Sequence, residues 1–372
     1  MQTELLKHHE FRFEVSDKPV KIRVVKGHCE IKGEEMILGK CYRFLDCKTF
    51  LFAHEDSVLE IEGDFDASYE TDNTNVLQLL RFFIKINGIK KEANFKFAQN
   101  DNTNIFEQKT FTVLGQGKST FVQTLANYLI RYNKKVLITE LNPSTGFLLF
   151  PGCISSVLVQ KLIDAAGENK FENMITFFYG SSNISYNPDF YSEILKNLNE
   201  ILGKKDFDFH FIIGDEKIVE RCCDLENLNG CKIVLKDEKL FSKIIGNKIL
   251  ITNGAYEAKD KGIKFFSAKE FTTYNIKMWT KVVRIGEEFV APETALPIGS
   301  ERKTEKNTVL ESKPRKNMIL GASYAEEESE VVTAPIKGFV LVNEVGDGFV
   351  KVHSPQPNLK SKFLLQGEIS LS

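Results

Sequence analysis

Residues 115–120 read Gly-Gln-Gly-Lys-Ser-Thr, and they stand between an apolar run and a helical pattern. The run 110–114 is β-branched and apolar, which is typical of a buried strand. The apolar positions 121, 122, 125, 129 and 130 have helical spacing. A strand, a glycine turn and a helix in this order form the context of a phosphate-binding P-loop, so the sequence predicts a P-loop-like α/β fold.

The loop itself is shorter than the full motif. The motif G-x-x-x-x-G-K-[ST] places four residues between its glycines, whereas a single glutamine separates Gly115 from Gly117. Four residues allow several backbone N–H groups to surround a phosphate. The retained half, Lys118 with Ser119 and Thr120 at a helix start, still predicts an anion site. An ordinary turn is the alternative, and the flanking strand and helix argue against it.

The next apolar run, 135–141, predicts a second buried strand, and Asn142 follows it. A carboxylate that organises Mg²⁺ normally stands at this point. An amide holds a hard cation more weakly than a carboxylate and cannot act as a general base. The sequence therefore predicts a weakened site for phosphoryl transfer.

The composition is typical of a folded, soluble globular protein. Its 372 residues predict two or three domains, each with its own core. The formal net charge of −2 argues against bulk electrostatic capture of nucleic acid. Residues 1–9 lack the apolar core of a signal peptide, and no apolar run approaches the ~20 residues that cross a membrane. We therefore expect a soluble cytoplasmic or nuclear protein without a membrane partner.

The chain is expected to form three domains. Residues 1–97 alternate apolar and polar side chains between turn signals, which predicts an antiparallel β-sandwich. Residues 98–272 alternate predicted strands and helices, which favours a parallel sheet with flanking helices. Residues 273–372 are predicted to form a small β-rich domain.

Individual elements follow from the same patterns. In the central domain we expect strands at 110–114, 135–141, 175–179, 207–213, 231–235 and 248–252, and helices at 118–131, 155–165, 188–202 and 215–223. In the last domain we expect strands at 276–285, 338–345 and 349–352, and a charged surface loop at 302–317.

Three ordered blocks of sequence match a known family. The blocks comprise 10–15, 27–35 and 69–74, then 117–120, 140–142, 146, 151–152 and 178–181, and finally 296–299, 338–345 and 354–357. With these residues the chain resembles the Clp subunits of messenger-RNA cleavage and polyadenylation factor IA, which belong to the polynucleotide 5′-hydroxyl kinase family. The resemblance spans nearly the whole chain.

The resemblance implies a bound ATP·Mg²⁺ between the first two domains. Lys118 would contact the β- and γ-phosphates, Ser119 or Thr120 the Mg²⁺ ion, and Glu30 the adenine side. Asn142 stands where the family has its catalytic aspartate. The nucleotide-binding residues that we expect are Gly115, Gly117, Lys118, Ser119, Thr120 and Glu30, with Ser119 as the metal ligand.

This sequence departs from the family pattern at several catalytic positions. Besides the short loop and Asn142, residues 144–146 read Ser-Thr-Gly where relatives have Gly-Gln-Gly. The substrate-clasp segment with its Gly-Trp is missing after Leu198, and the only tryptophan is Trp279. No arginine occurs between Arg221 and Arg284, although the lid should supply arginines to the transferring phosphate.

These departures favour a non-catalytic scaffold with a degenerate ATP site over an active enzyme. The resemblance implies a nuclear role in pre-mRNA 3′-end cleavage and polyadenylation. It also implies that the large CTD-binding subunit of the same factor and other 3′-end processing subunits are partners, with indirect or weak contact to pre-mRNA. The alternative is an active ATP-dependent RNA 5′-hydroxyl kinase. Whether ATP binds to the shortened loop is left open by the sequence.

Overall fold

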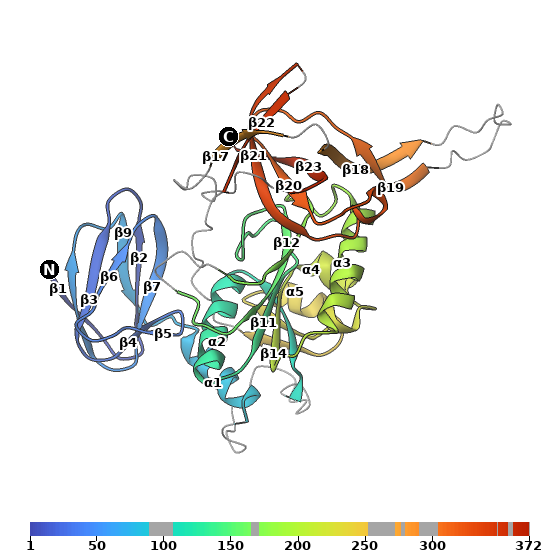
Figure 1. Cartoon of the computed structure of the whole chain (residues 1–372). Coiled ribbons are helices and arrows are strands. Elements are labelled where there is room, and N and C mark those ends of the chain that lie inside the picture. The colour runs from blue at the N-terminus through green and yellow to red at the C-terminus, as the bar shows by residue number, and fades with distance from the viewer. Residues whose placement is uncertain are drawn as a thin grey trace, which may run out of the picture. The chain divides into compact units, whose positions relative to one another are not determined.

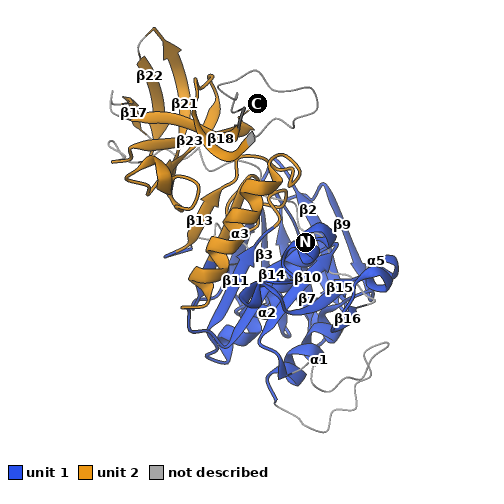
Figure 2. Ribbon diagram, turned by 90° about the vertical axis from the view of Figure 1, so that its right-hand side faces the viewer, with its two compact units in different colours: residues 1–141, 157–173, 205–260 blue, residues 142–156, 174–204, 261–372 orange. Residues whose placement is uncertain are grey.

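The computed structural model describes residues 1–88, 107–164, 171–251, 272–276, 280–289, 304–347, 349–355 and 360–371. The chain divides into two compact units, coloured separately in Figure 2. Unit 1 comprises residues 1–141, 157–173 and 205–260, and unit 2 comprises residues 142–156, 174–204 and 261–372.

Unit 1 begins with the predicted β-sandwich (Figure 1). Its two antiparallel sheets have the orders β1-β8-β3-β6 and β5-β4-β7-β2-β9. The nine strands are β1 Gln2–Leu5, β2 Glu10–Val15, β3 Val20–Lys26, β4 Cys29–Ile31, β5 Glu34–Glu35, β6 Cys41–Phe44, β7 Cys47–Ala53, β8 Ser57–Glu62 and β9 Ala67–Thr71. Alternate residues of β3, namely Val20, Ile22 and Val24, point into one shared core.

The expectation that residues 1–97 are wholly β is wrong for one segment, because α1 spans Val76–Ile86. Its ring of Phe82 packs edge-on against Phe111, with 5.4 Å between the ring centroids. Phe111 belongs to the central sheet, so α1 covers part of that sheet rather than extending the sandwich. The proposed boundary at 97/98 lies outside the described residues.

The central sheet of unit 1 contains the parallel strands β11-β14-β10-β15-β16. Their bounds are β10 Thr110–Gly115, β11 Val136–Glu140, β14 Phe209–Ile213, β15 Cys231–Leu235 and β16 Lys248–Ile251. On β10, Phe111 packs on α1, whereas Leu114 packs with Phe241 of α5. Helices therefore cover both faces, as the predicted α/β fold requires.

Three helices of unit 1 follow strands of this sheet. They are α2 Lys118–Arg131, as predicted, α4 Glu216–Arg221, and α5 Glu238–Lys243, which the sequence patterns did not indicate. A short 3-10 turn covers Glu226–Leu228. In the described part of the chain, no helix combines the length and apolar character needed to cross a membrane.

The helix predicted at 155–165 is wrong, because β12 occupies Cys153–Val159. Residues 153–156 pair antiparallel with β13, Ile175–Phe178. Every residue of β12 except Leu158 is buried, and continuous burial without a polar face is compatible with a core strand as well as a helix.

Unit 2 contains helix α3, Pro188–Leu202, with the predicted bounds. Oδ1 of Asn187 accepts a hydrogen bond from the Phe190 N–H at 3.0 Å, and Pro188 opens the helix. Asparagine at the cap and proline at the first position are the usual start signals of a helix, so the sequence sets this boundary.

Unit 2 also contains a seven-stranded sheet in the order β17-β22-β21-β20-β23-β18-β19. Its strands are β17 Thr272–Asn275, β18 Lys281–Phe289, β19 Thr304–Glu311, β20 Met318–Ser323, β21 Ile336–Gly346, β22 Phe349–Ser354 and β23 Phe363–Ser370, with a 3-10 turn at Glu328–Glu330. All pairs are antiparallel except β18 with β23. The predicted β-rich C-terminal region is confirmed.

Two expectations for this region need correction. The loop predicted at 302–317 is wrong in part, because β19 pairs with β18 over residues 304–311. The strand predicted from 276 begins at 281. Trp279 and the segment 296–299 lie outside the described residues.

Candidate functional site

The shortened loop forms a tight joint between β10 and α2. Gly115 has φ +94° and Gly117 has φ +78°, in the left-handed region where a side chain is strained. A Cβ on Gly115 would lie 2.4 Å from the carbonyl oxygen of Leu235. The first helical bond follows directly, from the Phe121 N–H to the Gly117 carbonyl at 3.0 Å. Both glycines are therefore required by the turn itself.

The start of α2 has no side-chain cap. Gly117 is the N-cap and has no side chain to bind the N–H groups of the first turn. These groups and the helix dipole attract an anion, and Lys118 and Ser119 stand there partly exposed. Thr120 is buried, with 3% of its surface exposed. The predicted anion-binding residues are thus brought together by the strand–helix joint.

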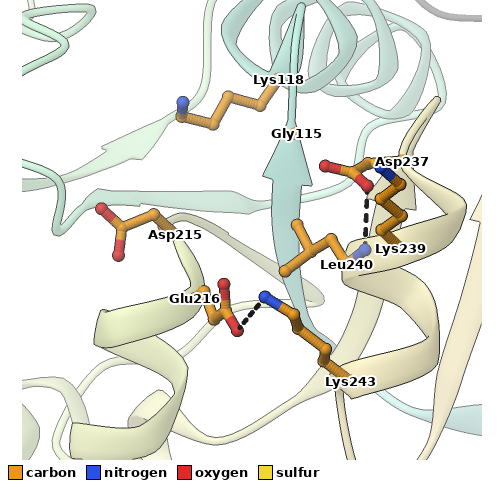
Figure 3. Close-up of a pocket in the computed structure, with 9 residues that line it drawn as sticks. Gly115, Lys118, Asp215, Glu216, Asp237, Lys239, Leu240 and Lys243 are labelled. Carbon is orange, nitrogen blue, oxygen red and sulfur yellow. Dashed lines mark hydrogen bonds and ion pairs between the residues drawn. The ribbon is translucent and has the colours of Figure 1, made fainter.

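A cavity of about 460 Å³ opens beside this joint (Figure 3). It is lined by residues from three helix starts and the ends of three neighbouring parallel strands: Gly115, Lys118, Gly214, Asp215, Glu216, Asp237, Lys239, Leu240 and Lys243. The carboxyl edge of a parallel sheet is the usual position of a ligand site in α/β proteins. The cavity therefore coincides with the edge that the P-loop-like motif predicts.

The charges around the cavity are balanced, since three lysines face three carboxylates. Oδ1 of Asp215 accepts a hydrogen bond from the Ile218 N–H at 3.1 Å and caps α4. Nζ of Lys243 lies 3.5 Å from Oε1 of Glu216, so an ion pair joins α5 to α4. A polyphosphate entering the cavity would meet as many negative as positive side chains, which weakens its electrostatic attraction.

The acidic residues of the cavity were not among the site residues predicted from the sequence. Asp237 accepts a hydrogen bond from the Leu240 N–H at 2.8 Å and caps α5, as Asp215 caps α4. Each aspartate follows a buried strand by two residues and precedes a helix. An acid in this position is a recognisable cap signal, so both could have been found from sequence.

Asn142 forms a local turn. Its side chain is buried, and Oδ1 accepts hydrogen bonds from the Ser144 N–H at 3.0 Å and from Ser144 Oγ at 2.8 Å. Its backbone carbonyl accepts from the N–H and the hydroxyl of Thr145. The amide oxygen is thus committed to the backbone geometry after β11. An amide in this arrangement supplies no group that could remove a proton from a hydroxyl.

Glu30 lies in β4 of the sandwich and is buried, with 2% of its surface exposed. The Tyr128 hydroxyl of α2 donates a hydrogen bond to Oε1, and Nε2 of His54 lies 2.9 Å from Oε2. Protein groups thus engage both carboxylate oxygens. A contact between Glu30 and a nucleotide base stays a prediction, and it would compete with these two bonds.

The residues present fit part of the ATP·Mg²⁺ that the resemblance implies. The uncapped start of α2 with Lys118 fits one phosphate group. Ser119 offers a hydroxyl for a cation, but within the described ranges no three His, Cys, Asp or Glu side chains converge as a metal site. The geometry can therefore hold a phosphate. Few of the residues present could bind a metal ion or remove a proton.

Comparison with known families identifies the chain. Three family models match it in order: "N-terminal beta-sandwich domain of polyadenylation factor" over residues 4–93, "mRNA cleavage and polyadenylation factor CLP1 P-loop" over 115–213, and "Pre-mRNA cleavage complex II protein Clp1" over 271–371. The chain belongs to the Clp1 family. The P-loop match begins at residue 115, so it includes the shortened turn.

Relatives in this family align over nearly the full chain. A protein called "Protein CLP1 homolog" from Arabidopsis thaliana is 25% identical and covers 99% of this chain and 94% of its own length. The homolog from Nematostella vectensis is 23% identical, with 99% and 96% covered. The Clp1 family resemblance expected from the sequence is thus confirmed.

Solved structures support the same fold. A structure described as wild-type Clp1p bound to a segment of Pcf11p has a TM-score of 0.77 at 17% identity and covers 100% of this chain and 97% of its own chain. A second, described by its extended Clp1p–Pcf11p interface and by the loss of ATP in a point mutant, matches with the same TM-score and identity. At this identity, the likeness establishes the fold.

Proposed function

We propose that this Clp1-family chain is a non-catalytic scaffold subunit of the nuclear machinery for pre-mRNA 3′-end cleavage and polyadenylation. Family membership supports the process, because all three family models carry descriptions from polyadenylation or pre-mRNA cleavage. The Asn142 turn carries the non-catalytic part: the side chain at the position of the catalytic acid is an amide bound to Ser144.

The balanced cavity supports the same proposal. Phosphoryl transfer depends on cationic groups that stabilise negative charge on the transferred phosphate. Here Lys239 and Lys243 are accompanied by the carboxylates of Asp237 and Glu216. Among the cavity residues there is no arginine that could offer a bidentate contact. Each such loss removes rate by powers of ten in enzymes of this type.

The proposed partner is the large CTD-binding subunit of the same factor, with other 3′-end processing subunits around it. Two related solved structures contain Clp1p together with Pcf11p. A net charge of −2 gives no long-range attraction to RNA, so we propose that contact with pre-mRNA is indirect or weak.

ATP and Mg²⁺ are the cofactors that the family suggests, and we propose that this chain binds ATP weakly while the start of α2 holds a single phosphate or sulfate. The single residue between Gly115 and Gly117 leaves too short a backbone to surround a β-phosphate. The helix start itself is intact.

Purified protein tests this function in two assays. In the first, a 5′-hydroxyl oligoribonucleotide is incubated with ATP and Mg²⁺, and no phosphorylated product above a no-enzyme control is expected. In the second, wild type and Lys118→Ala are compared for binding to the CTD-binding subunit, with equal affinity expected. Activity that is lost in Lys118→Ala would instead establish the alternative, an RNA 5′-hydroxyl kinase, for which the retained Lys118 at the cavity is the favouring observation.

A further inference from the structure

One face of α2 contacts a single hairpin of the N-terminal sandwich. Thr124, Asn127, Tyr128 and Arg131 are spaced three, four and seven residues from the first, so they line the same side of the helix. Opposite them lies the hairpin of residues 29–35, formed by β4 and β5. These four residues and this hairpin are called the hairpin clamp below.

The centre of the hairpin clamp is a close backbone approach. Gly33 has φ +80°, and a Cβ there would lie 2.6 Å from the carbonyl oxygen of Thr124. Beside it, Nδ2 of Asn127 donates to the Lys32 carbonyl at 2.9 Å. Asn127 is fully buried and also binds the backbone N–H of Ile163 at 2.8 Å and its carbonyl at 3.0 Å. The asparagine therefore ties the hairpin and a second segment to α2.

A buried carboxylate and phenol lie next to this contact. Tyr128 donates a hydrogen bond to Oε1 of Glu30, and His54 is hydrogen-bonded to Oε2 of the same carboxylate. Burial and the neighbouring Glu30 raise the pKa of Tyr128 well above its usual value, so the phenol keeps its proton. The hydrogen bond between Tyr128 and Glu30 is therefore kept at neutral pH.

The exposed rim of the hairpin clamp is ionic. Nη2 of Arg131 lies 3.1 Å from Oε2 of Glu35, and Nε2 of His28 lies 3.1 Å from the other oxygen of that carboxylate. The rings of His28 and His54 stack with 4.8 Å between their centroids. Exposed pairs of this kind contribute little, so the buried centre dominates.

We propose that the hairpin clamp holds the N-terminal sandwich on the P-loop helix without any nucleotide. Buried polar groups need partners, and here protein atoms satisfy both oxygens of Glu30 and the amide of Asn127. No ligand atom is required to complete this interface. The inference goes beyond the proposed function, because these contacts lie within the chain and exist whether or not it transfers phosphate.

Amide hydrogen exchange on the full-length protein tests the hairpin clamp directly. In wild type without nucleotide, residues 29–35 and 124–131 should exchange as slowly as β7, to which β4 is paired. Addition of Mg·ATP should change these rates less than about threefold. The proposal is overturned if the nucleotide-free hairpin exchanges at least about tenfold faster than β7 and ATP restores its protection.

Two matched variants provide a second readout. Tyr128→Phe removes the hydroxyl that binds Glu30, and exchange of residues 29–35 should rise about tenfold. Tyr179→Phe is the control, because that buried hydroxyl binds the Ile184 carbonyl and the Asn187 N–H within unit 2. It should leave the hairpin unchanged. Equal hairpin rates in wild type and Tyr128→Phe would contradict the proposal.

Failure of the hairpin clamp and failure of the scaffold function are distinguishable. Kinase activity in the same preparation would refute the scaffold function and leave the exchange result intact. If Tyr128→Phe does not fold, the comparison of wild type with and without Mg·ATP still decides the proposal.

Discussion

Oγ1 of Thr139 on β11 lies 2.8 Å from Nε2 of His210 on the adjacent strand β14. His210 is completely buried in the central sheet. Burial lowers the pKa of its imidazole to about 3, since a charged ring would lose its hydration there. The folded protein therefore keeps a neutral histidine at the middle of the sheet that carries the loop.

This histidine predicts a pH dependence of stability. The pKa of histidine in the unfolded chain is about 6.5, so below that pH the unfolded state binds a proton that the folded state does not. Stability should fall as the pH decreases from about 6.5 toward 3, with a slope of about 1.4 kcal/mol per pH unit from this group. Denaturant unfolding between about pH 4 and pH 6 measures the slope.

His210→Gln should lower that slope by about 1.4 kcal/mol per pH unit, which corresponds to the loss of one titrating proton. Thr139→Val is the control: it removes the hydroxyl partner but leaves the titrating ring, so it should lower stability without flattening the slope. An unchanged slope in His210→Gln would show that His210 is not the titrating group.

The contact at Gly33 predicts a large effect of one methyl group. Gly33→Ala should destabilise the protein by about 2 kcal/mol or more, because the Cβ would meet the Thr124 carbonyl in a strained backbone conformation. Gly39 has a similar φ of +76° but no atom within 4 Å of a Cβ. Gly39→Ala should cost only about 1 kcal/mol, from the backbone conformation alone.

Thermal and denaturant unfolding of both variants measure the two losses of stability. Gly39→Ala reports the backbone strain alone, and Gly33→Ala adds the steric contact of the Cβ with the Thr124 carbonyl. The difference between them reports the close approach of the sandwich to α2. Equal losses in the two variants would mean that the hairpin can move away from the helix freely.

Asn142→Asp tests whether one carboxylate restores catalysis. An aspartate can accept the same two bonds from Ser144, so stability should change by less than about 0.5 kcal/mol. No transfer of phosphate to a 5′-hydroxyl oligoribonucleotide is expected, because the short loop and the balanced cavity remain. Asn142→Ala should lose about 1–2 kcal/mol, since the Ser144 N–H and hydroxyl lose their acceptor. Kinase activity in Asn142→Asp would show that the amide alone blocks the reaction.

The cavity charges predict a gain in anion affinity from a single neutralisation. Glu216→Gln removes one of three carboxylates and releases Lys243 from its ion pair. ATP or phosphate should then bind about three- to tenfold more tightly at low salt, with the gain reduced at high salt. Glu238→Gln makes the same charge change on α5 outside the cavity lining and should have a smaller effect. Calorimetric titration measures both, and equal responses would argue against a local effect.

Much of the fold could be predicted where local signals agree with tertiary packing. The bounds of α2 and α3 were correct, because the glycine turn of the P-loop-like motif precedes one and an Asn-Pro cap opens the other. The strands β10 and β14 were also predicted, because short apolar runs in alternation with helices are typical of a parallel sheet.

The errors have a common physical origin. Burial of β12 is nearly continuous, so its apolar run resembled a buried helix, and only pairing with β13 makes it a strand. The charged strand β19 resembled a loop, because its strand character comes from pairing with β18. For α1, an apolar helix face was present, but the β-rich context concealed it.

For the site, the sequence could place the loop residues together. It could not show which protein groups bind the side chains that were expected to contact a ligand. Lys118 and Gly115 do line one cavity, as the motif predicts. The engagement of Glu30 by Tyr128 joins residues 98 positions apart. Such long-range contacts have no signature in a single sequence.

The last strand of the C-terminal sheet lies inside that sheet, between β20 and β18. Both neighbours are made earlier on the ribosome, and β18 pairs with β23 in parallel, across about 80 residues. The C-terminal sheet therefore cannot be completed before residues 363–370 are made. We expect the N-terminal sandwich to complete its folding during synthesis, before the C-terminal sheet is complete.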